Sequence, residues 1–393
     1  MGKECVVKNT GLRGVKVADT RISFIDGEKG ILVYRGYRIE DLAKFSTFEE
    51  VAWLLLKGDV PSPSGLDDFR KRLVEMSVLP DFLLKSMKAW PVDTSPISAL
   101  MASIAILGFS DRTVDNESIE EHEERAVRLI ASLSSAMVAW DRVRRGLEIL
   151  SPLAGHGIAW NILYCLSGKE CDPEIVKALD VCLVLHADHS FNASTFACRE
   201  VASTKADMYA GVLAGIAALS GPLHGGANEK VMEMLAGLQN EPDVEGWVSK
   251  EIKDGRKIMG MGHAVYRTTD PRAVFLKEMA RRLGEKFGKT RLCILSEEIE
   301  RAAISIFELK GKTGIKHNVD FYSAPVYHMI GLPHDLFTPV FAASRIVGWC
   351  AHIIEEKFGL AQQKPSLYRP SAEYIGNYCG LMGCEFKKGV KEE

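Results

Sequence analysis

The sequence predicts a mainly α-helical protein of two domains, with one short β-hairpin near its N-terminus. Three observations lead to this fold class. From residue 40 onward, apolar residues recur at helical spacing in one segment after another, and strand-like runs are almost absent. An extended, alternating pattern is confined to the stretch 20–37. The chain has 393 residues, which is long for one hydrophobic core and favours two domains.

The stretch 20–37 has the pattern of two paired strands. Apolar residues alternate around Phe24, Asp26 and Gly27 supply a turn, and the extended pattern resumes at Ile31. We therefore expect a short β-hairpin here.

Five later segments place their apolar residues on one helical face. Ser46 is suited to cap the first of them and Asp172 the third, where Pro173 fits the first helical turn. The expected helices are 48–56, 123–145, 172–189, 271–287 and 296–308. The segment 206–219 is rich in Ala and Gly, so it is either a buried central helix or a helix at a subunit interface.

Composition indicates an ordinary globular protein. The chain is 47% hydrophobic and 26% charged. Its 49 Lys and Arg residues nearly balance its 52 Asp and Glu residues, whereas a nucleic-acid-binding protein usually has a basic excess. We expect no membrane-spanning segment, the best candidate being 208–219, and residues 1–10 lack the apolar stretch of a signal peptide. A cytoplasmic protein with no nucleic-acid or membrane partner is therefore expected.

The nine cysteines are scattered and form no C-x-x-C pair, which argues against a zinc ribbon or a disulfide scaffold. Cys5 lies near one end of the chain, and Cys379 and Cys384 near the other. A bridge between the ends is an open alternative, because closing so long a loop stabilises by about 4–5 kcal/mol on a chain-entropy model.

Four segments carry reactive side chains in patterns that a core does not require. The first, 185–195, places His186, Asp188 and His189 within four residues. Two interpretations stay open. His186 and His189 share a helix face and can ligate a metal, although the spacing shows no third ligand; a histidine here can instead bind a substrate carboxylate.

The second segment, 221–228, places His224 at a turn before a helical pattern. The positive end of a helix dipole disfavours protonation of such a histidine, and a neutral imidazole can donate a hydrogen bond to a carbonyl. The alternative is an ordinary histidine in a surface loop.

The third segment, 260–272, combines His263, Arg267 and Arg272 with two glycines that allow a ligand to approach the backbone. Arginine suits bidentate contact with carboxylate or phosphate, so this segment is a candidate anion site. The alternative is a solvated basic loop.

The fourth segment, 316–323, sets Asp320 between two apolar residues. A carboxylate in such surroundings is a candidate base with a shifted pKa, and a helix cap is the alternative. Arg345 lies in an otherwise apolar helical stretch, where a buried arginine needs an anionic partner. Arg345 and Arg369 are either ligand-binding groups or members of structural ion pairs.

Taken together, these segments resemble the citrate synthase family. The resemblance extends from 25–32 to 368–374. Its most specific parts are Gly221-Pro-Leu-His-Gly-Gly-Ala-Asn-Glu229, Gly262-His-Ala-Val-Tyr-Arg267 with Asp270-Pro-Arg272, and Asn318-Val-Asp320. Their order and spacing make coincidence implausible, and the length is similar to that of the shorter bacterial and archaeal members.

The resemblance implies a multi-helical, two-domain fold in which a small domain closes over a large one. The large domain would comprise residues 1–225 and 332–393, and the small domain 226–331 would contribute the CoA site and the catalytic aspartate. A homodimer is also implied, with Arg369 of one subunit completing the site of the other. Oxaloacetate and acetyl-CoA would be substrates and CoA a product, with no permanently bound cofactor and no metal.

Residue roles follow from the matching motifs. The resemblance implies that His224 hydrogen-bonds the thioester oxygen while Asp320 removes a methyl proton, and that His263 polarises the ketone of oxaloacetate and protonates the new alkoxide. Hydrolysis of citryl-CoA would then release citrate and CoA. The implied ligands of the substrate carboxylates are His189, Arg272, Arg345 and Arg369, and those of CoA are Arg267, Lys257, Gly260, Gly262 and Lys312.

Rival functions stay open. 2-Methylcitrate synthase uses propionyl-CoA with the same catalytic groups, and one methylene discriminates by only about 1–3 kcal/mol, so the motifs do not separate the two enzymes or exclude dual activity. A zinc hydrolase built on His186, Asp188 and His189 predicts bound metal and loss of activity with a chelator. A catalytically inactive relative is a third alternative, although every catalytic position is filled.

Overall fold

The computed structural model describes residues 11–12, 14–362 and 364–376, and it is mainly α-helical. The strands are β1 (Ser23–Asp26), β2 (Ile31–Tyr34) and β3 (Tyr37–Arg38). The helices are α1 (Ile39–Phe45), α2 (Phe48–Lys57), α3 (Pro63–Met76), α4 (Asp81–Met87), α5 (Pro96–Gly108), α6 (Ile119–Arg144), α7 (Ile158–Ser167), α8 (Pro173–His186), α9 (Ala193–Ser203), α10 (Met208–Leu219), α11 (Ala227–Gly237), α12 (Val244–Lys253), α13 (Pro271–Lys286), α14 (Thr290–Leu309), α15 (Val319–Met329), the 3-10 helix η1 (His334–Leu336) and α16 (Phe337–Phe358).

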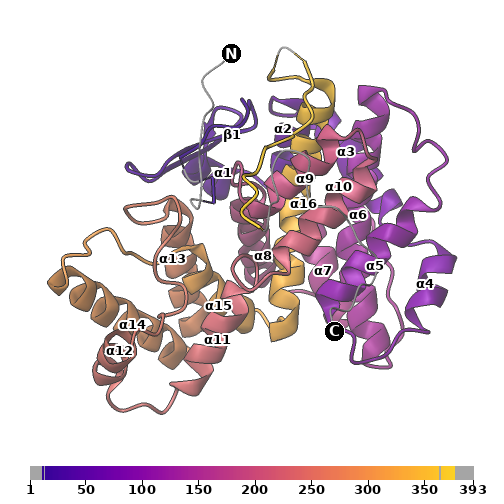
Figure 1. The fold of residues 1–393 in the computed structure, drawn as a ribbon. Helices are drawn as coiled ribbons and strands as arrows, with labels where there is room; N and C mark the ends of the chain where they lie inside the picture. The colour runs from indigo at the N-terminus through magenta and orange to yellow at the C-terminus, as the bar shows by residue number, and fades with distance from the viewer. Residues whose placement is uncertain (1–10, 13, 363, 377–393) are drawn as a thin grey trace, which may run out of the picture.

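The helices form two groups (Figure 1). Helices α11 to α15, coloured salmon to orange, lie together at the lower left, and the other helices surround α16. Helix α16 contacts α6, α8, α9 and α10, and it is buried along nearly its whole length. The predicted mainly α-helical class is therefore confirmed.

The N-terminal hairpin is present and carries one further short strand. β1 and β2 pair antiparallel with Asp26 opposite Ile31, and Tyr34 pairs with Tyr37 to add β3. Asp26 turns the chain as expected, because its Oδ1 accepts hydrogen bonds from the N–H groups of Glu28 and Lys29.

The expected helices all occur, and several of their ends are corrected. Thr47, not Ser46, caps α2: its hydroxyl accepts from the Glu50 N–H while the Glu50 carboxylate accepts from the Thr47 N–H. Asp172 caps α8 as predicted, but α8 ends at His186, so that Asp188 and His189 lie in the loop after it.

Two helices begin earlier than their apolar pattern indicates. α6 starts at Ile119 behind the cap Ser118, and its first turn contains Glu120 and Glu121, which conceal the pattern but favour a helix N-terminus. α14 starts at Thr290, and its buried face already includes Leu292 in the first turn.

The expectation that no segment is long and apolar enough to cross a membrane was wrong for 334–358, which contains α16. By length and composition alone, this segment is long and apolar enough to cross a membrane. Its apolar window is entirely buried inside the fold, as in a core helix.

The Ala- and Gly-rich segment forms α10, which is buried on one face only. A Cβ at Gly215 would lie 2.5 Å from Sγ of Cys198 and 3.0 Å from the Trp349 ring, so small residues are required there for close helix packing. The opposite face, with Ala214 and Ala217, is partly or fully exposed. A buried central helix therefore explains only half of the pattern.

The cysteines near the chain ends, Cys5, Cys379 and Cys384, lie outside the described residues. The described cysteines are free thiols.

Candidate active site

The candidate side chains from distant segments meet between α16 and the α11–α15 group. The loop after α8 brings His189 to His263, with ring centroids 5.3 Å apart, and Arg345 of α16 donates to the carbonyl of His186 at 2.7 Å. The turn before α11 adds His224, and the first turn of α15 adds Asp320. Arg272, His263, Arg345 and His224 all act on the pKa of His189, and Arg272 and Arg345 act on that of Asp320. These groups therefore lie near one another, although His189 and Arg345 are 156 residues apart in the sequence (345 − 189).

His224 is held by Ser194 at the start of α9. Its Nε2 lies 2.8 Å from Oγ of Ser194 and 3.3 Å from the amide nitrogen of the same residue. Because an amide N–H only donates, Nε2 is an acceptor and the ring proton lies on Nδ1. Burial and the positive charge of Arg345 lower the pKa of His224 to about 4. The imidazole is therefore neutral at pH 7, with Nδ1–H as its donor.

His263 is also neutral but has the opposite tautomer. Its Nδ1 accepts hydrogen bonds from the backbone N–H groups of Val265 at 3.0 Å and Tyr266 at 3.1 Å, which places the ring proton on Nε2. Burial and the charge of Arg272 lower the pKa of His263 to about 4. The site therefore contains two neutral imidazoles, each with one N–H donor of fixed position.

A short pairing of two chain segments fixes His263 relative to Asp320; we call residues 260–262 and 316–318 the paired strap. The Gly262 N–H donates to the Lys316 carbonyl at 2.7 Å, and the Asn318 N–H donates to the Gly260 carbonyl at 2.9 Å. The backbone of Gly260 has φ +77°, and a Cβ there would lie 2.8 Å from Cβ of Phe321. Glycine is therefore required at this position.

Asp320 lies in the first turn of α15, which Asn318 caps. Oδ1 of Asn318 accepts from the Asp320 N–H at 3.0 Å, and its amide group donates to the Gly262 carbonyl at 2.9 Å. Burial raises the pKa of Asp320 to about 6, against the opposing positive charges of Arg272 and Arg345. The carboxylate is therefore a stronger base than an ordinary aspartate, while remaining mostly ionised at pH 7.

Arg345 is a buried cation without a carboxylate partner among the described residues. It is 1% exposed, its Nε donates to the His186 carbonyl, and its guanidinium lies 4.8 Å from the centre of the Phe341 ring. Burial lowers the pKa of Arg345 to about 10. A buried charge left unpaired is costly, so this side chain is ready to bind an anionic ligand.

Arg272, in contrast, already has an anionic partner. Its Nε and Nη2 contact Oδ1 and Oδ2 of Asp270 at 3.0 and 2.7 Å, and both residues are buried. Asp270 also caps α13 through the Arg272 N–H. Because Asp270 neutralises Arg272, the pair adds little net charge to the site. Its contacts fix the position of the Arg272 guanidinium.

His186 ends α8, Asp188 and His189 follow it, and the three side chains have different neighbours. Nε2 of His189 lies 3.2 Å from the Tyr266 hydroxyl, and burial together with Arg272 lowers the pKa of His189 well below its ordinary value. Nδ1 of His186 lies 2.8 Å from the Cys182 carbonyl, inside the core. Asp188 contacts Ser23 and the Ser190 amide instead.

These three side chains therefore contact different partners. Within residues 11–376, apart from 13 and 363, no group of three or more His, Cys, Asp or Glu side chains is arranged to hold a metal ion. The zinc hydrolase alternative therefore has no ligand set in this part of the chain.

Arg369 lies outside the cluster of its own chain. It is exposed, and its Nη1 donates to the neighbouring Pro370 carbonyl at 3.0 Å. The preceding Tyr368 is fastened to the protein: its hydroxyl donates to Glu356 at 2.8 Å and its N–H to Oγ of Ser203 at 3.3 Å. The backbone before Arg369 is therefore anchored while its side chain points outward.

The cations predicted to bind CoA are on the surface of the α11–α15 group. Lys257, Arg267 and Lys312 are exposed, and none forms an ion pair with the residues that the structure describes. The neighbouring Lys316 differs, because it pairs with Glu308 at 2.8 Å. The N–H of Arg267 donates to the Gly27 carbonyl, which ties this surface to the hairpin loop.

Sequence reasoning missed the residues that orient the candidate catalytic groups. Ser194, Tyr266, Asn318 and Asp270 each act on a partner through a hydrogen bond or ion pair described above. Asp270 and Asn318 had a local signal, since each precedes a helix as a cap. The contact between Ser194 and His224 joins residues 30 positions apart and has no such signal.

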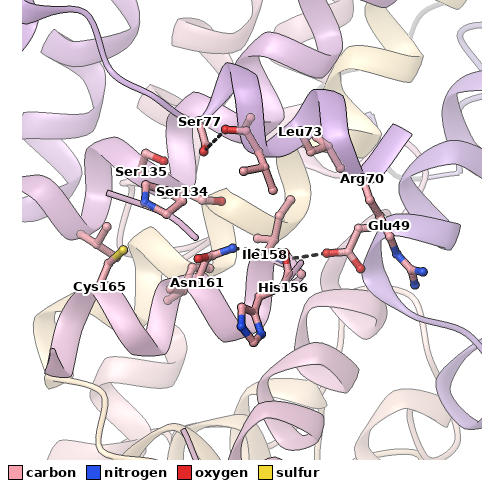
Figure 2. Close-up of a pocket in the computed structure, with 16 residues that line it drawn as sticks. Glu49, Arg70, Leu73, Ser77, Ser134, Ser135, His156, Ile158, Asn161 and Cys165 are labelled. Carbon is pink, nitrogen blue, oxygen red and sulfur yellow. Dashed lines mark hydrogen bonds between the residues drawn. The ribbon is translucent and has the colours of Figure 1, made fainter. Parts of the chain in front are cut away.

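A separate cavity lies among α2, α3, α6 and α7 (Figure 2). Its lining includes Glu49, Arg70, Asn161 and Cys165, and none of the predicted site residues. Oε1 of Glu49 accepts from the Ile158 N–H at 2.7 Å, so this carboxylate caps α7. The cavity is therefore distinct from the candidate active site.

Comparison with known proteins gives a consistent result. The family model described as citrate synthase, C-terminal domain, matches residues 11–371. Citrate synthase 2 of Bacillus subtilis is 40% identical over 367 residues, which cover 93% of this chain and 95% of that protein. The 2-methylcitrate synthase of Shewanella oneidensis is 36% identical over 93% of this chain and 94% of its own length.

Among solved structures, the chain is similar to citrate synthase from the thermophilic archaeon Thermoplasma acidophilum, in a ternary complex with carboxymethyl coenzyme A and oxaloacetate. The TM-score is 0.87 at 32% identity, covering 96% of this chain and 97% of that one.

Proposed function

The chain belongs to the citrate synthase family, and on that premise we propose that it condenses acetyl-CoA with oxaloacetate and water to give citrate and CoA. The observation that carries the proposal is the meeting of two neutral imidazoles and one carboxylate beside an unpaired, buried arginine. Each of the three groups has a step to perform.

The first step is removal of a methyl proton from acetyl-CoA. A thioester α-proton is a very weak acid, so a carboxylate can remove it only where donors stabilise the developing oxyanion. We assign Asp320 as the base, since its pKa of about 6 makes it stronger than an ordinary carboxylate. We assign Nδ1–H of His224 to the thioester oxygen, on which the negative charge develops.

The second step forms the carbon–carbon bond. The enolate carbon attacks the ketone carbon of oxaloacetate, the thioester carbonyl re-forms, and the ketone oxygen becomes an alkoxide that takes up a proton. Nε2–H of His263 is the donor assigned to this oxygen, because the backbone N–H groups at 265 and 266 hold the proton on Nε2. Water then cleaves the thioester of citryl-CoA to release citrate and CoA.

The two carboxylates of oxaloacetate require cationic partners. Arg345 is unpaired, but Asp270 neutralises Arg272, so one chain supplies a single uncompensated cation for a dianion. We therefore assign Arg369 of a partner subunit as the second cation, with His189 and Arg272 as further hydrogen-bond donors. The outward position of Arg369 supports this assignment.

A surface suited to that partner lies on α5 and α10, which pack side by side. Ile97, Met101 and Ala214 are partly exposed there, and Phe109 at the end of α5 is 82% exposed. Exposed apolar side chains on neighbouring helices are expected at a subunit interface. We therefore propose a homodimer, in which the exposed face of α10 is covered by the partner.

CoA is assigned to the edge of the α11–α15 group. Lys257, Arg267 and Lys312 are exposed cations suited to phosphate, and Gly260 and Gly262 let a ligand approach the backbone. No metal and no permanently bound cofactor takes part in the proposed reaction.

Closure of the two domains protects the thioester from water. We assign residues 226–331 to the small domain, and residues 1–225 and 332–393 to the large domain. Closing the site around oxaloacetate before acetyl-CoA reacts prevents useless hydrolysis of the thioester. A cytoplasmic location is proposed with this function.

A second candidate function is 2-methylcitrate synthesis from propionyl-CoA, because relatives with that name match over the same length. The test is thioester cleavage by the purified protein, followed by ultraviolet absorbance, with acetyl-CoA or propionyl-CoA and with or without oxaloacetate. Oxaloacetate-dependent cleavage that favours acetyl-CoA supports the proposal. A clear preference for propionyl-CoA assigns the second function, and no oxaloacetate-dependent cleavage of either refutes both.

A further inference from the structure

Glu300 of α14 is a buried carboxylate to which no step of the reaction has been assigned, yet three side chains from different segments converge on it. Nζ of Lys277 on α13 lies 2.7 Å from its Oε2, and Nδ1 of His317 lies 2.9 Å from its Oε1. The hydroxyl of Tyr322 on α15 donates to Oε2. Glu300 itself is 8% exposed.

Glu300 is ionised in this environment. Burial opposes the charge, but His317, Lys277 and Tyr322 outweigh that effect and lower the pKa of Glu300 to about 2. Burial and the hydrogen bond to Glu300 raise the pKa of Tyr322, so its phenol remains a protonated donor. The cluster is therefore a charged carboxylate that accepts hydrogen bonds from Lys277 and Tyr322 and is in ion-pair contact with His317.

Two of these three side chains flank the proposed catalytic base in the chain. His317 precedes Asp320 by three residues and Tyr322 follows it by two (320 − 317 and 322 − 320). His317 also belongs to the paired strap, where it forms a β-bridge with Met261. Through the side chains of His317 and Tyr322, Glu300 restrains the chain on both sides of Asp320. Because His317 belongs to the strap, Glu300 also restrains the segment that leads to His263.

The carboxylate of Asp320 depends on this support, because among the described residues no hydrogen bond is accepted by its own oxygens. Asp320 is held through its backbone instead: its N–H donates to Oδ1 of Asn318, and its carbonyl accepts from Oγ of Ser323. The position of the carboxylate is therefore set by the backbone of the strap and of the first turn of α15.

We propose that Glu300 is a positioning residue for proton abstraction, acting on Asp320 through His317 and Tyr322. The proposal rests on the proposed role of Asp320 as the base. Misplacing a reacting group by about 1 Å costs on the order of 10²-fold in rate. Loss of Glu300 should therefore lower kcat. It should not weaken oxaloacetate binding, because His189 and Arg345 are held by other contacts.

The test compares Glu300→Ala and Tyr322→Phe with the control Glu298→Ala. Glu298 lies on the same helix, where it forms a half-exposed ion pair with Arg291 at 3.1 Å. The readouts are kcat, KM for oxaloacetate, thermal unfolding, and exchange of the acetyl-CoA methyl protons in D₂O with L-malate, which has no ketone to attack. Exchange isolates proton abstraction from condensation.

Glu300→Ala should lower kcat and methyl-proton exchange together by about 100-fold, with KM for oxaloacetate within about twofold. Tyr322→Phe removes one hydroxyl and should lower both rates by about three- to tenfold, while Glu298→Ala should change neither. A folded Glu300→Ala protein with kcat within about threefold of the parent, or with KM raised as much as kcat is lowered, overturns the proposal. If Glu300→Ala does not fold, Tyr322→Phe decides, and unchanged exchange in that variant overturns it.

The role of Asp320 is tested separately by Asp320→Asn. An active Asp320→Asn protein overturns the assignment of the base, whereas an inactive Asp320→Asn protein beside an active Glu300→Ala protein overturns only the positioning role of Glu300.

Discussion

The rate of acetyl-CoA cleavage should follow the ionisation of Asp320 as the pH falls. Burial raises the pKa of this carboxyl to about 6, and only the ionised form can accept a methyl proton. Asp320 is about nine-tenths ionised at pH 7 and about one-tenth ionised at pH 5, so kcat/KM for acetyl-CoA should fall about tenfold between these values. The sign is fixed: acid removes activity.

The histidines should add no inflection above pH 5. The pKa of His224 and that of His263 are each lowered to about 4, so both imidazoles stay neutral over the range in which Asp320 titrates. If either acted as an imidazolium, activity would instead fall on the alkaline side. The profile from pH 4.5 to 8.5 therefore separates the two forms of the mechanism.

The assay is thioester absorbance at saturating oxaloacetate and constant ionic strength, with thermal unfolding measured at each pH to exclude loss of fold. A carboxyl inflection is distinguished from a histidine inflection by adding an organic cosolvent. Ionisation of a carboxyl creates charge, so a lower dielectric raises its pKa, whereas loss of a proton from imidazolium creates no new charge. An inflection that the cosolvent leaves in place, or a rate that rises on acidification, would refute the assignment to Asp320.

Three further outcomes are expected. Arg345→Met should raise KM for oxaloacetate by about 100-fold, or about 3 kcal/mol, without lowering the melting temperature. The reason is that it removes a buried cation that has no carboxylate partner among the described residues. A protein of much lower melting temperature would show that Arg345 is structural. Ser194→Ala should lower kcat by about 10- to 100-fold with little change in KM, because Nε2 of His224 loses its hydroxyl partner; an unchanged kcat would show that Ser194 does not orient His224. Mixing inactive Asp320→Asn and Arg369→Ala proteins should restore about a quarter of the parental activity. Random pairing makes about half of the dimers heterodimers, and each heterodimer has one intact site of its two. No recovery after subunit exchange would contradict the shared site.

The candidate catalytic groups could be singled out from the sequence because each lies in a local pattern that packing does not require. Two histidines beside an aspartate, a histidine at a turn before a helix, and an arginine in an apolar helix are all visible in the sequence. Arg345 shows how far this reasoning extends: burial was expected and is present, while the expected anion is not among the described residues. That combination favours the ligand-binding alternative for Arg345 over the structural ion pair.

The orientation of these groups could not be predicted in the same way. The tautomer of His224 depends on Ser194, and the charge available from Arg272 depends on how Asp270 packs against it. Helix starts were missed where acidic first turns conceal the apolar pattern, as at α6. The apolar length of α16 was missed because Arg345, Glu355 and Glu356 interrupt its apolar pattern. In the fold, Arg199 pairs with Glu355 and Glu356, whereas Arg345 has no carboxylate partner among the described residues.

The catalytic assignment is tested most directly by methyl-proton exchange in the Asp320→Asn protein. The parent enzyme should exchange the methyl protons of acetyl-CoA with D₂O when L-malate fills the oxaloacetate site. Asp320→Asn removes the base and keeps the shape of the side chain, so exchange should fall by at least about 10³-fold while oxaloacetate still binds. Exchange at near the parental rate in a folded Asp320→Asn protein would show that another group removes the proton, and the proposed mechanism would be wrong.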